Sequence, residues 1–362
     1  MRITALGVLA FLAIPRVLAQ EPLRLAIAGL VHGHAAGFFR AAQTRRDVTI
    51  IGVYEPDAAL AKQYASRYGL PPEVFYTDLD RMLDAVKPEA VAAFTATYDH
   101  PRIVEAAAAR KLAVMMEKPL AVSMEHAREI ERTAGRSGIP VVVNYETTWY
   151  PNHAALKELL IDKRATGEIR KMAATDGHQG PKEIGVGPEF FAWLTDPVKN
   201  GAGALFDFGC YGANLMTWLM DNQRPLSVTA VTRQVKPAVY PHVEDEATVV
   251  LQYPRAQGII QASWNWPFNR KDFEVYTERA YAVAGTGGAS LRVRLPDAPE
   301  EVRTPQPLPA DEKDPVSYLR AVARGKIKPS GLSSLENNLV VTEILTAARE
   351  SARTGQTVRL RQ

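Results

Sequence analysis

The sequence contains only one cysteine, Cys210, among its 362 residues. A single cysteine excludes an intramolecular disulfide and a zinc site built from cysteine ligands, so the fold must be stabilised by its hydrophobic core. The sequence also lacks an excess of charge: 43 Lys and Arg residues face 40 Asp and Glu residues, without runs of one sign. This balance gives no indication of a nucleic-acid or membrane-surface partner. With 46% hydrophobic residues, the composition is typical of a globular protein large enough for two domains.

The N-terminal apolar run, residues 3–14, is too short to span a bilayer. It follows the positive charge of Arg2, and Val17 and Ala19 occupy the small-residue positions that precede a cleavage site. The pattern predicts a signal peptide over residues 1–19; an uncleaved membrane anchor is the alternative. We therefore expect the mature protein in the periplasm or outside the cell, with no membrane contact after cleavage.

Residues 20–145 alternate between apolar runs and amphipathic segments. The runs that we predict as strands are residues 23–29, 48–54, 90–95, 113–116 and 140–144. Helices are predicted at residues 34–43, 58–68, 79–86, 101–110 and 124–136. Strands that alternate with helices of this length are typical of a parallel, doubly wound sheet, so we predict an α/β Rossmann domain here.

Residues 146–362 follow a different pattern, in which long strand-like segments predominate. Strands are predicted at residues 169–175, 227–235, 247–253, 258–266, 273–284, 290–295 and 358–360. Helices are predicted at residues 152–160, 209–220, 315–324 and 335–354, and a surface loop at residues 296–314. Runs of strands after a βαβ half predict an α+β second domain on an open, mostly antiparallel sheet, with a C-terminal helix that can pack back on the first domain.

One predicted strand ends in residues suited to ligand binding. The apolar residues 113–116 are followed by Glu117, Lys118 and Pro119. In open α/β sheets, ligands bind beyond the carboxyl ends of the strands, which is where Glu117 and Lys118 fall. The alternative is a surface Glu–Lys pair at which Pro119 simply ends the strand.

The loop after the first strand partly matches the dinucleotide-binding pattern G-x-G-x-x-G. Gly29 occupies the first glycine position, whereas Val31 and His34 occupy the other two; Gly33 keeps some backbone freedom nearby. Cofactor phosphate would lie at the N-terminus of the following helix, where backbone N–H groups point outward. His32 and His34 are candidates to face that phosphate or to cap the helix. A βαβ unit that binds no nucleotide is the alternative.

An acidic residue, Glu55, follows the second predicted strand at slightly more than the usual spacing of about 20 residues from the glycine loop. A carboxylate there accepts hydrogen bonds from the ribose 2′-OH and repels a 2′-phosphate, so NAD is favoured. NADP remains open, because Arg24, Arg45 and Arg46 cannot be placed relative to the ribose from the sequence.

Several motifs occur in the order found in a known family. The sequence Glu-Lys-Pro at residues 117–119 follows His100, and Asp-Phe-Gly-Cys-Tyr at residues 207–211 follows the glycine-rich residues 201–206. A C-terminal segment, residues 335–360, completes the set. Together these motifs resemble the Gfo/Idh/MocA oxidoreductase family, which includes glucose-fructose oxidoreductase and inositol dehydrogenase. The resemblance covers nearly all of the mature chain.

The resemblance implies NAD(P) in the first domain, a sugar or cyclitol between the domains, and a homodimer or homotetramer formed through the open sheet. We expect no metal. By position, the resemblance makes Lys118 the catalytic lysine, in contact with the cofactor and before a cis peptide bond to Pro119. It gives Asp207 the role of fixing the lysine or the substrate. The remaining predicted cofactor contacts are Thr95, His100 and Glu117.

The family commonly has histidine where this chain has Tyr211, and tyrosine resembles the glucose-fructose oxidoreductase branch. Tyr211 is therefore our candidate to take the substrate hydroxyl proton as hydride leaves for the nicotinamide. Free tyrosine has a pKa near 10, and we expect the ammonium of Lys118 to lower it. Without the resemblance, a core aromatic residue would be the simpler interpretation.

Aromatic and amide side chains after the strands are suited to line the substrate pocket. The candidates are Tyr145, His178 and Trp266. Aromatic faces suit sugar rings, but they equally suit a sheet that packs against another subunit.

The leading hypothesis is a secreted NAD-dependent oxidoreductase that keeps its cofactor bound, oxidising one sugar and reducing another. An NAD-dependent glycoside hydrolase, which oxidises its substrate transiently and eliminates a leaving group, is the second hypothesis. It needs an extra base, for which His178 or Tyr145 is a candidate. A non-catalytic sugar-binding module is the third.

Overall fold

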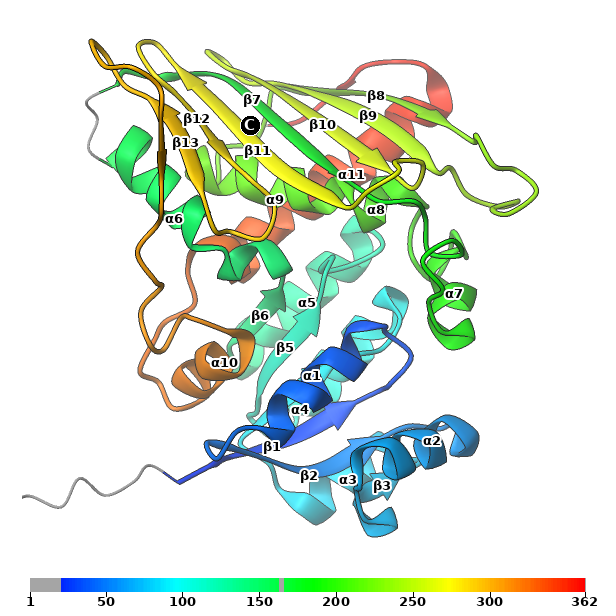
Figure 1. The fold of residues 1–362 in the computed structure, drawn as a ribbon. Coiled ribbons are helices and arrows are strands. Elements are labelled where there is room, and N and C mark those ends of the chain that lie inside the picture. The colour runs from blue at the N-terminus through cyan, green and yellow to red at the C-terminus, as the bar shows by residue number, and fades with distance from the viewer. Residues whose placement is uncertain (1–20, 163–165, 362) are drawn as a thin grey trace, which may run out of the picture.

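The computed structural model describes residues 21–162 and 166–361, so the predicted signal peptide lies outside the described residues. The chain forms two sheets at opposite ends of the molecule, with helices between them (Figure 1). In the described part of the chain, no helix combines the length and the apolar character needed to cross a bilayer.

The first sheet is parallel throughout and has the order β3-β2-β1-β4-β5-β6. Its strands are β1 (Leu23–Ala28), β2 (Val48–Tyr54), β3 (Phe75–Tyr76), β4 (Ala90–Ala93), β5 (Ala113–Glu117) and β6 (Val141–Asn144). The strand order reverses between β1 and β4, which is where a doubly wound sheet binds its ligand. The predicted Rossmann sheet is confirmed.

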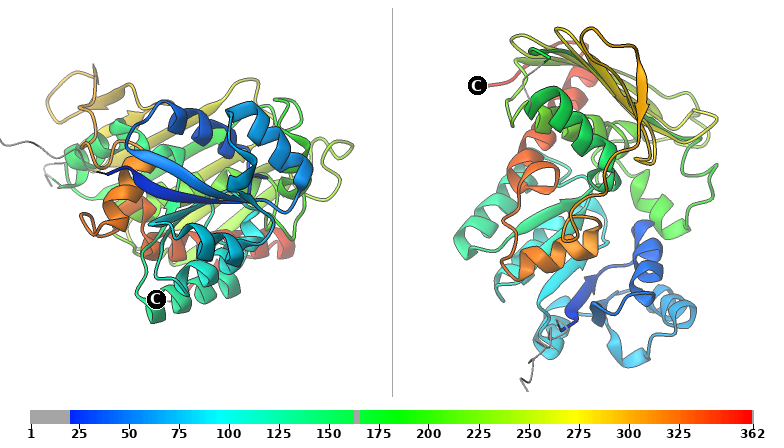
Figure 2. Two further views of the ribbon diagram at one scale, coloured as in Figure 1. Left: turned by 90° about the horizontal axis from the view of Figure 1, so that it is seen from below. Right: turned by 60° about the vertical axis from the view of Figure 1, so that its left-hand side comes forward.

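Helices cover both faces of this sheet, which explains its continuous apolar strands. They are α1 (His34–Gln43), α2 (Ala58–Tyr68), α3 (Leu79–Val86), α4 (His100–Ala108), α5 (Met124–Ser137) and α10 (Pro315–Ala323). In β5, Val114 and Met116 belong to the cluster that includes α4 and α5, while Ala113 and Met115 belong to the cluster that includes α1 and α10. The second half of the chain thus supplies α10 to the first sheet (Figure 2).

The second sheet has nine strands in the order β14-β13-β12-β11-β7-β10-β9-β8-β15. They are β7 (Ile169–Gly177), β8 (Ser227–Arg233), β9 (Glu246–Gln252), β10 (Gln257–Ser263), β11 (Arg270–Thr277), β12 (Tyr281–Ala284), β13 (Leu291–Arg294), β14 (Glu301–Arg303) and β15 (Val358–Arg359). Only the central pair β7–β10 is parallel. The mostly antiparallel sheet is therefore confirmed.

One face of the second sheet is covered by helices and the other is open (Figure 1). The covering helices are α6 (Pro151–Lys157), α8 (Ala204–Asp207), α9 (Gly209–Leu219) and α11 (Leu335–Thr354). Gly212 lets α9 lie close to the sheet, because a Cβ there would come within 2.8 Å of the Cβ of Ala174 on β7. A short helix, α7 (Pro188–Leu194), reaches from this half toward the first sheet.

Two sequence predictions in this half were wrong. Residues 273–284 do not form one strand, because a turn at Glu278–Arg279 divides them into β11 and β12. The predicted loop at residues 296–314 contains the edge strand β14. Apolar periodicity does not mark a tight turn inside an alternating pattern, and a strand of three residues is too short to produce one.

Candidate active site

The loop after β1 requires glycine at its first position. Gly29 has a φ of +82°, and a Cβ there would lie 2.6 Å from Cγ2 of Thr95. The backbone therefore passes directly over the end of β4, at the reversal of strand order. This close approach gives a physical reason for the one glycine that matches the dinucleotide pattern.

A cavity of about 310 Å³ lies beside this loop. Its lining includes Gly29, Val31, Glu55 and Thr95, four of the predicted cofactor contacts, together with Arg102. The backbone N–H groups of Leu30 and Asp57 each donate to one oxygen of Glu55, both at 2.9 Å. Burial raises the pKa of this carboxyl. Glu55 thus fixes the glycine loop as well as lining the cavity.

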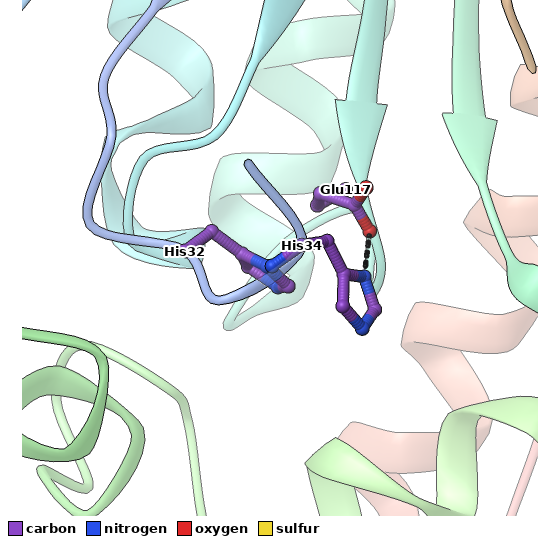
Figure 3. Close-up of side chains that lie close together, drawn as sticks. All are labelled: His32, His34 and Glu117. Carbon is purple, nitrogen blue, oxygen red and sulfur yellow. Dashed lines mark hydrogen bonds and ion pairs between the residues drawn. The ribbon is translucent and has the colours of Figure 1, made fainter. Parts of the chain in front are cut away.

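Three further predicted residues, His32, His34 and Glu117, lie together at the other end of the loop (Figure 3). His34 Nδ1 is 2.9 Å from Glu117 Oε2, and the second oxygen of Glu117 accepts a hydrogen bond from Asn144. Potential ligand atoms of the three residues lie within 4.8 Å of one another. However, His32 Nδ1 already accepts the N–H of His34 at 3.2 Å. These contacts make the cluster a hydrogen-bonded brace between the loop and β5.

Helix α7 covers this loop. Trp193 Nε1 donates to the carbonyl oxygen of Val31 at 3.1 Å. The ring of His32 lies 4.9 Å from that of Phe190 and 5.4 Å from that of Trp193, measured between centroids. Burial lowers the pKa of His32 well below 6.5, so this ring is neutral at neutral pH. The contact joins the second half of the chain to the dinucleotide loop.

Lys118 forms an ion pair with Asp207 at the interface between the two halves. Its Nζ lies 2.5 Å from Oδ1 of Asp207, and Trp264 Nε1 donates to Oδ2 at 2.9 Å. Burial opposes both charges, but the ion pair together with other nearby groups outweighs it. The pKa of Lys118 is therefore raised and that of Asp207 is lowered. The peptide bond between Lys118 and Pro119 is cis, as predicted.

Tyr211 lies beside this pair, on α9, and is 2% exposed. Lys118 Nζ is 5.2 Å from its ring centroid. Burial, followed by the charge of Glu146, raises the pKa of Tyr211 well above 10. The predicted lowering by Lys118 is therefore wrong for this structure, because the ammonium is paired with Asp207 and lies over the ring.

Of the predicted substrate residues, Tyr145 packs against Tyr211, whereas His178 and Trp266 make contacts with other residues. Tyr145 is fully buried, with its ring edge-on to that of Tyr211 at 5.6 Å. His178 packs edge-on against Phe208, and its Nδ1 accepts the N–H of Gly180 at 2.9 Å. Trp266 is half-buried and donates its backbone N–H to the carbonyl oxygen of His178.

His100, a predicted cofactor contact, is fully buried away from the cavity surface. Its Nδ1 is 3.0 Å from the carbonyl oxygen of Leu120, just after the cis peptide bond. Burial lowers its pKa to about 4. In this position His100 supports the turn that carries Lys118.

Sequence reasoning missed a second lysine at the site. Lys271 on β11 is 7% exposed, and its Nζ lies 4.6 Å from the ring centroid of Tyr211. It forms an ion pair with Glu146 in η3 (Glu146–Trp149). Asp176 on β7 is the direct cross-strand partner of Lys271. A charged residue at an inward position of an alternating strand was the available signal for both Lys271 and Asp176.

Comparison with known families agrees with this geometry. The NAD-binding Rossmann-fold model of the Gfo/Idh/MocA oxidoreductases matches residues 23–145, and a C-terminal domain model of the same family matches residues 153–288. The chain belongs to the Gfo/Idh/MocA family. It is an NAD(P)-dependent oxidoreductase of this type, which confirms the predicted family, enzyme class and cofactor.

The matches to individual relatives cover most of the chain. A trans-1,2-dihydrobenzene-1,2-diol dehydrogenase from Oryctolagus cuniculus is 25% identical over 348 residues, which cover 90% of this chain and 96% of the relative. Among solved structures, an aldose-aldose oxidoreductase from Caulobacter crescentus in complex with glycerol has a TM-score of 0.77 at 21% identity; the match covers 94% of this chain and 100% of that one. An inositol dehydrogenase homologue from Azotobacter vinelandii, in complex with NADH and myo-inositol, has the same TM-score at 18% identity and covers 94% and 98%.

Proposed function

We propose that the mature protein is a secreted dehydrogenase that keeps NAD bound and oxidises a secondary hydroxyl of a diol, sugar or cyclitol. The observation that carries the proposal is the placement of Lys118, Asp207 and Tyr211 together between the two halves of the chain. The relatives named for a diol, an aldose and an inositol support this substrate class.

The described residues fit NAD. Gly29 and Thr95 line the cavity beside the loop, and Glu55 at its wall is an acceptor suited to ribose hydroxyls. An ionised carboxylate has about four acceptor sites. Glu55 can therefore hold the loop N–H groups and still accept from a ribose. Its negative charge disfavours a 2′-phosphate, which supports NAD over NADP.

When held by the loop after Gly29 and by Glu55, NAD would supply the hydride acceptor for the carbinol carbon. Tyr211 takes the proton of the substrate hydroxyl, so that a carbonyl forms, and returns a proton when a second carbonyl is reduced. Lys118 orients the hydroxyl oxygen of the substrate. Asp207 holds the lysine in place from both its carboxylate and its backbone carbonyl.

Retention of the cofactor follows from the proposed export. The signal-peptide pattern at residues 1–19 supports a periplasmic or extracellular protein, where no NAD pool exists to recycle a released cofactor. The cover that Phe190 and Trp193 form over the dinucleotide loop supports slow release. Oxidation of one sugar followed by reduction of another would then restore the starting state.

The test is to purify the exported protein without added nucleotide, denature it and quantify NAD and NADP in the supernatant. We expect about one NAD per chain. Protein that is empty, yet binds added NAD reversibly, would contradict retention while leaving the dehydrogenase activity intact. Release of nitrophenol from an aryl glycoside, without a second sugar, would instead favour the elimination chemistry.

We also infer that the open face of the second sheet joins copies of the chain. Val231 is 70% exposed there and Tyr276 38% exposed, and Ile259 on a central strand is only half-buried. A sheet face that no helix covers and that exposes apolar side chains among polar ones is suited to self-association. Val231→Glu should lower the molecular mass in solution, measured by light scattering; an unchanged mass would place the interface elsewhere.

A further inference from the structure

A second group of charged residues lies on the sheet side of Tyr211, outside the family motifs described above. Lys271 and Asp176 are direct partners in the register between β11 and β7, so their side chains share the face that α9 covers. Both are buried, with Asp176 1% exposed. Glu146, whose side chain is 45% exposed, reaches this face from η3 and pairs with Lys271.

The two carboxyl groups of this group, those of Glu146 and Asp176, differ in their hydrogen-bond partners. Glu146 receives both the Lys271 ammonium and the hydroxyl of Tyr150. In contrast, Oδ2 of Asp176 is buried and has no hydrogen-bond partner among the described residues. A buried polar atom without a partner is unfavourable, and in a native structure it calls for an explanation such as a functional role.

We propose that Asp176 binds a second hydroxyl of the substrate, next to the one that Tyr211 deprotonates, so that the site selects vicinal diols over simple alcohols. The assignment rests on the proposed function, because it takes Tyr211 as the group at the reacting hydroxyl. Lys271, the cross-strand partner of Asp176, places a positive charge near the carboxyl group and is itself held by Glu146.

The charges around Asp176 are consistent with a neutral polyol. Lys271 and Lys118 favour its ionised form, whereas burial, Asp272 and Glu146 oppose it, and the pKa of Asp176 is raised well above 3.8. A protonated carboxyl group has one O–H donor and a carbonyl acceptor. A hydroxyl group also both donates and accepts, so the two can pair without leaving a buried charge.

The experiment compares trans-cyclohexane-1,2-diol with cyclohexanol as hydride donors for the full mature protein, with a carbonyl acceptor present to reoxidise the retained cofactor after each turnover. We expect the wild type to prefer the diol by about 10–100-fold in kcat/KM. Asp176→Val should remove most of this preference, mainly by raising KM for the diol, while Asp176→Asn should retain part of it. The matched control is Glu274→Gln: Glu274 also lies on β11, but on the open face, where it accepts the hydroxyl of Tyr276. The control should keep the preference.

Equal losses on both alcohols in Asp176→Val would indicate a structural role and overturn the proposal, as would an unchanged preference. A crystal structure of the wild type with NAD and the diol tests the Asp176 assignment even if the variants do not fold. It should place one diol oxygen within about 3.2 Å of an Asp176 carboxyl oxygen; a bound diol away from Asp176 would overturn the assignment. If the diol binds at Asp176 and neither alcohol is oxidised, the proposed oxidation fails and the Asp176 assignment stands.

Discussion

Lys118 and Asp207 form an ion pair that is almost fully enclosed, with side-chain exposures of 6% and 8%. Removing one partner of such a pair leaves an uncompensated buried charge, which costs about 3–5 kcal/mol. Asp207→Asn should therefore lower the free energy of unfolding by about that amount. Urea unfolding followed by fluorescence measures the change.

The control for this prediction is an exposed ion pair, Lys157 with Asp162, at 28% and 51% side-chain exposure. Asp162→Asn should cost under about 1 kcal/mol, because solvent screens the pair. If both variants lost the same unfolding free energy relative to the wild type, the Lys118–Asp207 pair would be exposed to solvent in solution, contrary to the structure.

The acid–base role of Tyr211 predicts a specific pH dependence. Its pKa is raised well above 10, so the phenol form predominates at neutral pH. Carbonyl reduction needs the protonated form and should vary little between about pH 6 and 9, whereas alcohol oxidation needs the deprotonated form and should rise with pH over that range. Initial rates in both directions across this range check the prediction.

Tyr211→Phe should lower turnover in both directions by about 10²–10⁴-fold, because the proton-transfer group is lost. NAD affinity, measured by fluorescence titration, should remain. Tyr276→Phe is the matched control, since Tyr276 lies on the open face of the sheet, where its hydroxyl donates to Glu274. Full turnover by Tyr211→Phe with bound NAD would show that another group handles the proton.

A pH effect on stability is expected from the contact between α10 and the first sheet. The hydrogen bond from Arg45 is the main cause that lowers the pKa of Asp47 to about 2, and Arg320 on α10 adds to it. Because the folded-state pKa lies below the usual value, the stabilisation is complete above about pH 4 and is lost as the pH falls toward 2. Asp47→Asn should flatten the loss of unfolding free energy over this range.

Urea unfolding at several pH values between 2 and 5 measures that slope. Asp221→Asn, at an exposed carboxylate with a φ of +52° that asparagine also tolerates, is the control and should keep the wild-type slope. A wild-type slope in Asp47→Asn would mean that other carboxylates account for the acid sensitivity.

Five strands of the first sheet could be predicted from the sequence because they are largely buried on both faces. A continuous apolar run such as residues 113–116 is then enough to predict a strand, and Glu117 marks where the strand ends. The edge strand β3, which consists of two half-buried residues, was not predicted. Lys118, Asp207 and Tyr211 could be assigned to one site from the sequence only because their motifs occur in the order found in the family. Their mutual geometry, and with it the direction of the Tyr211 pKa shift, depends on contacts between distant segments.

Helix α7 was not predicted, because it too depends on contacts with a distant segment. Its seven residues are too few to establish a helical period, and its stability comes from packing of Phe190 and Trp193 against the dinucleotide loop. Asp176 and Lys271 were missed because a charged residue at one inward position is a weak signal in a single strand. Only the register between β7 and β11 brings the two together.

The contact between α7 and the loop yields a prediction based on two glycines. A Cβ on Gly33 would lie 2.9 Å from Cδ1 of Phe190, whereas a Cβ on Gly37, within α1, would meet no atom within 4 Å. Gly33→Ala should displace α7 from the loop and raise the rate of NAD release by about tenfold or more, since one displaced contact of about 1.4 kcal/mol has that effect. Stopped-flow displacement of bound NAD by an excess of competing nucleotide measures this rate.

Gly37→Ala serves as the control and should stabilise α1 by up to about 1 kcal/mol, because alanine replaces glycine inside a helix without a clash. Its NAD release should match the wild type. The double change Gly33→Ala with Phe190→Ala removes the clash along with the ring. If α7 retains the cofactor by covering the loop, the double variant will still release NAD quickly, because relief of the clash does not restore the cover. Slow release from the double variant would mean that Phe190 only fills space beside Gly33, and that the affinity for NAD comes from the loop and Glu55 alone.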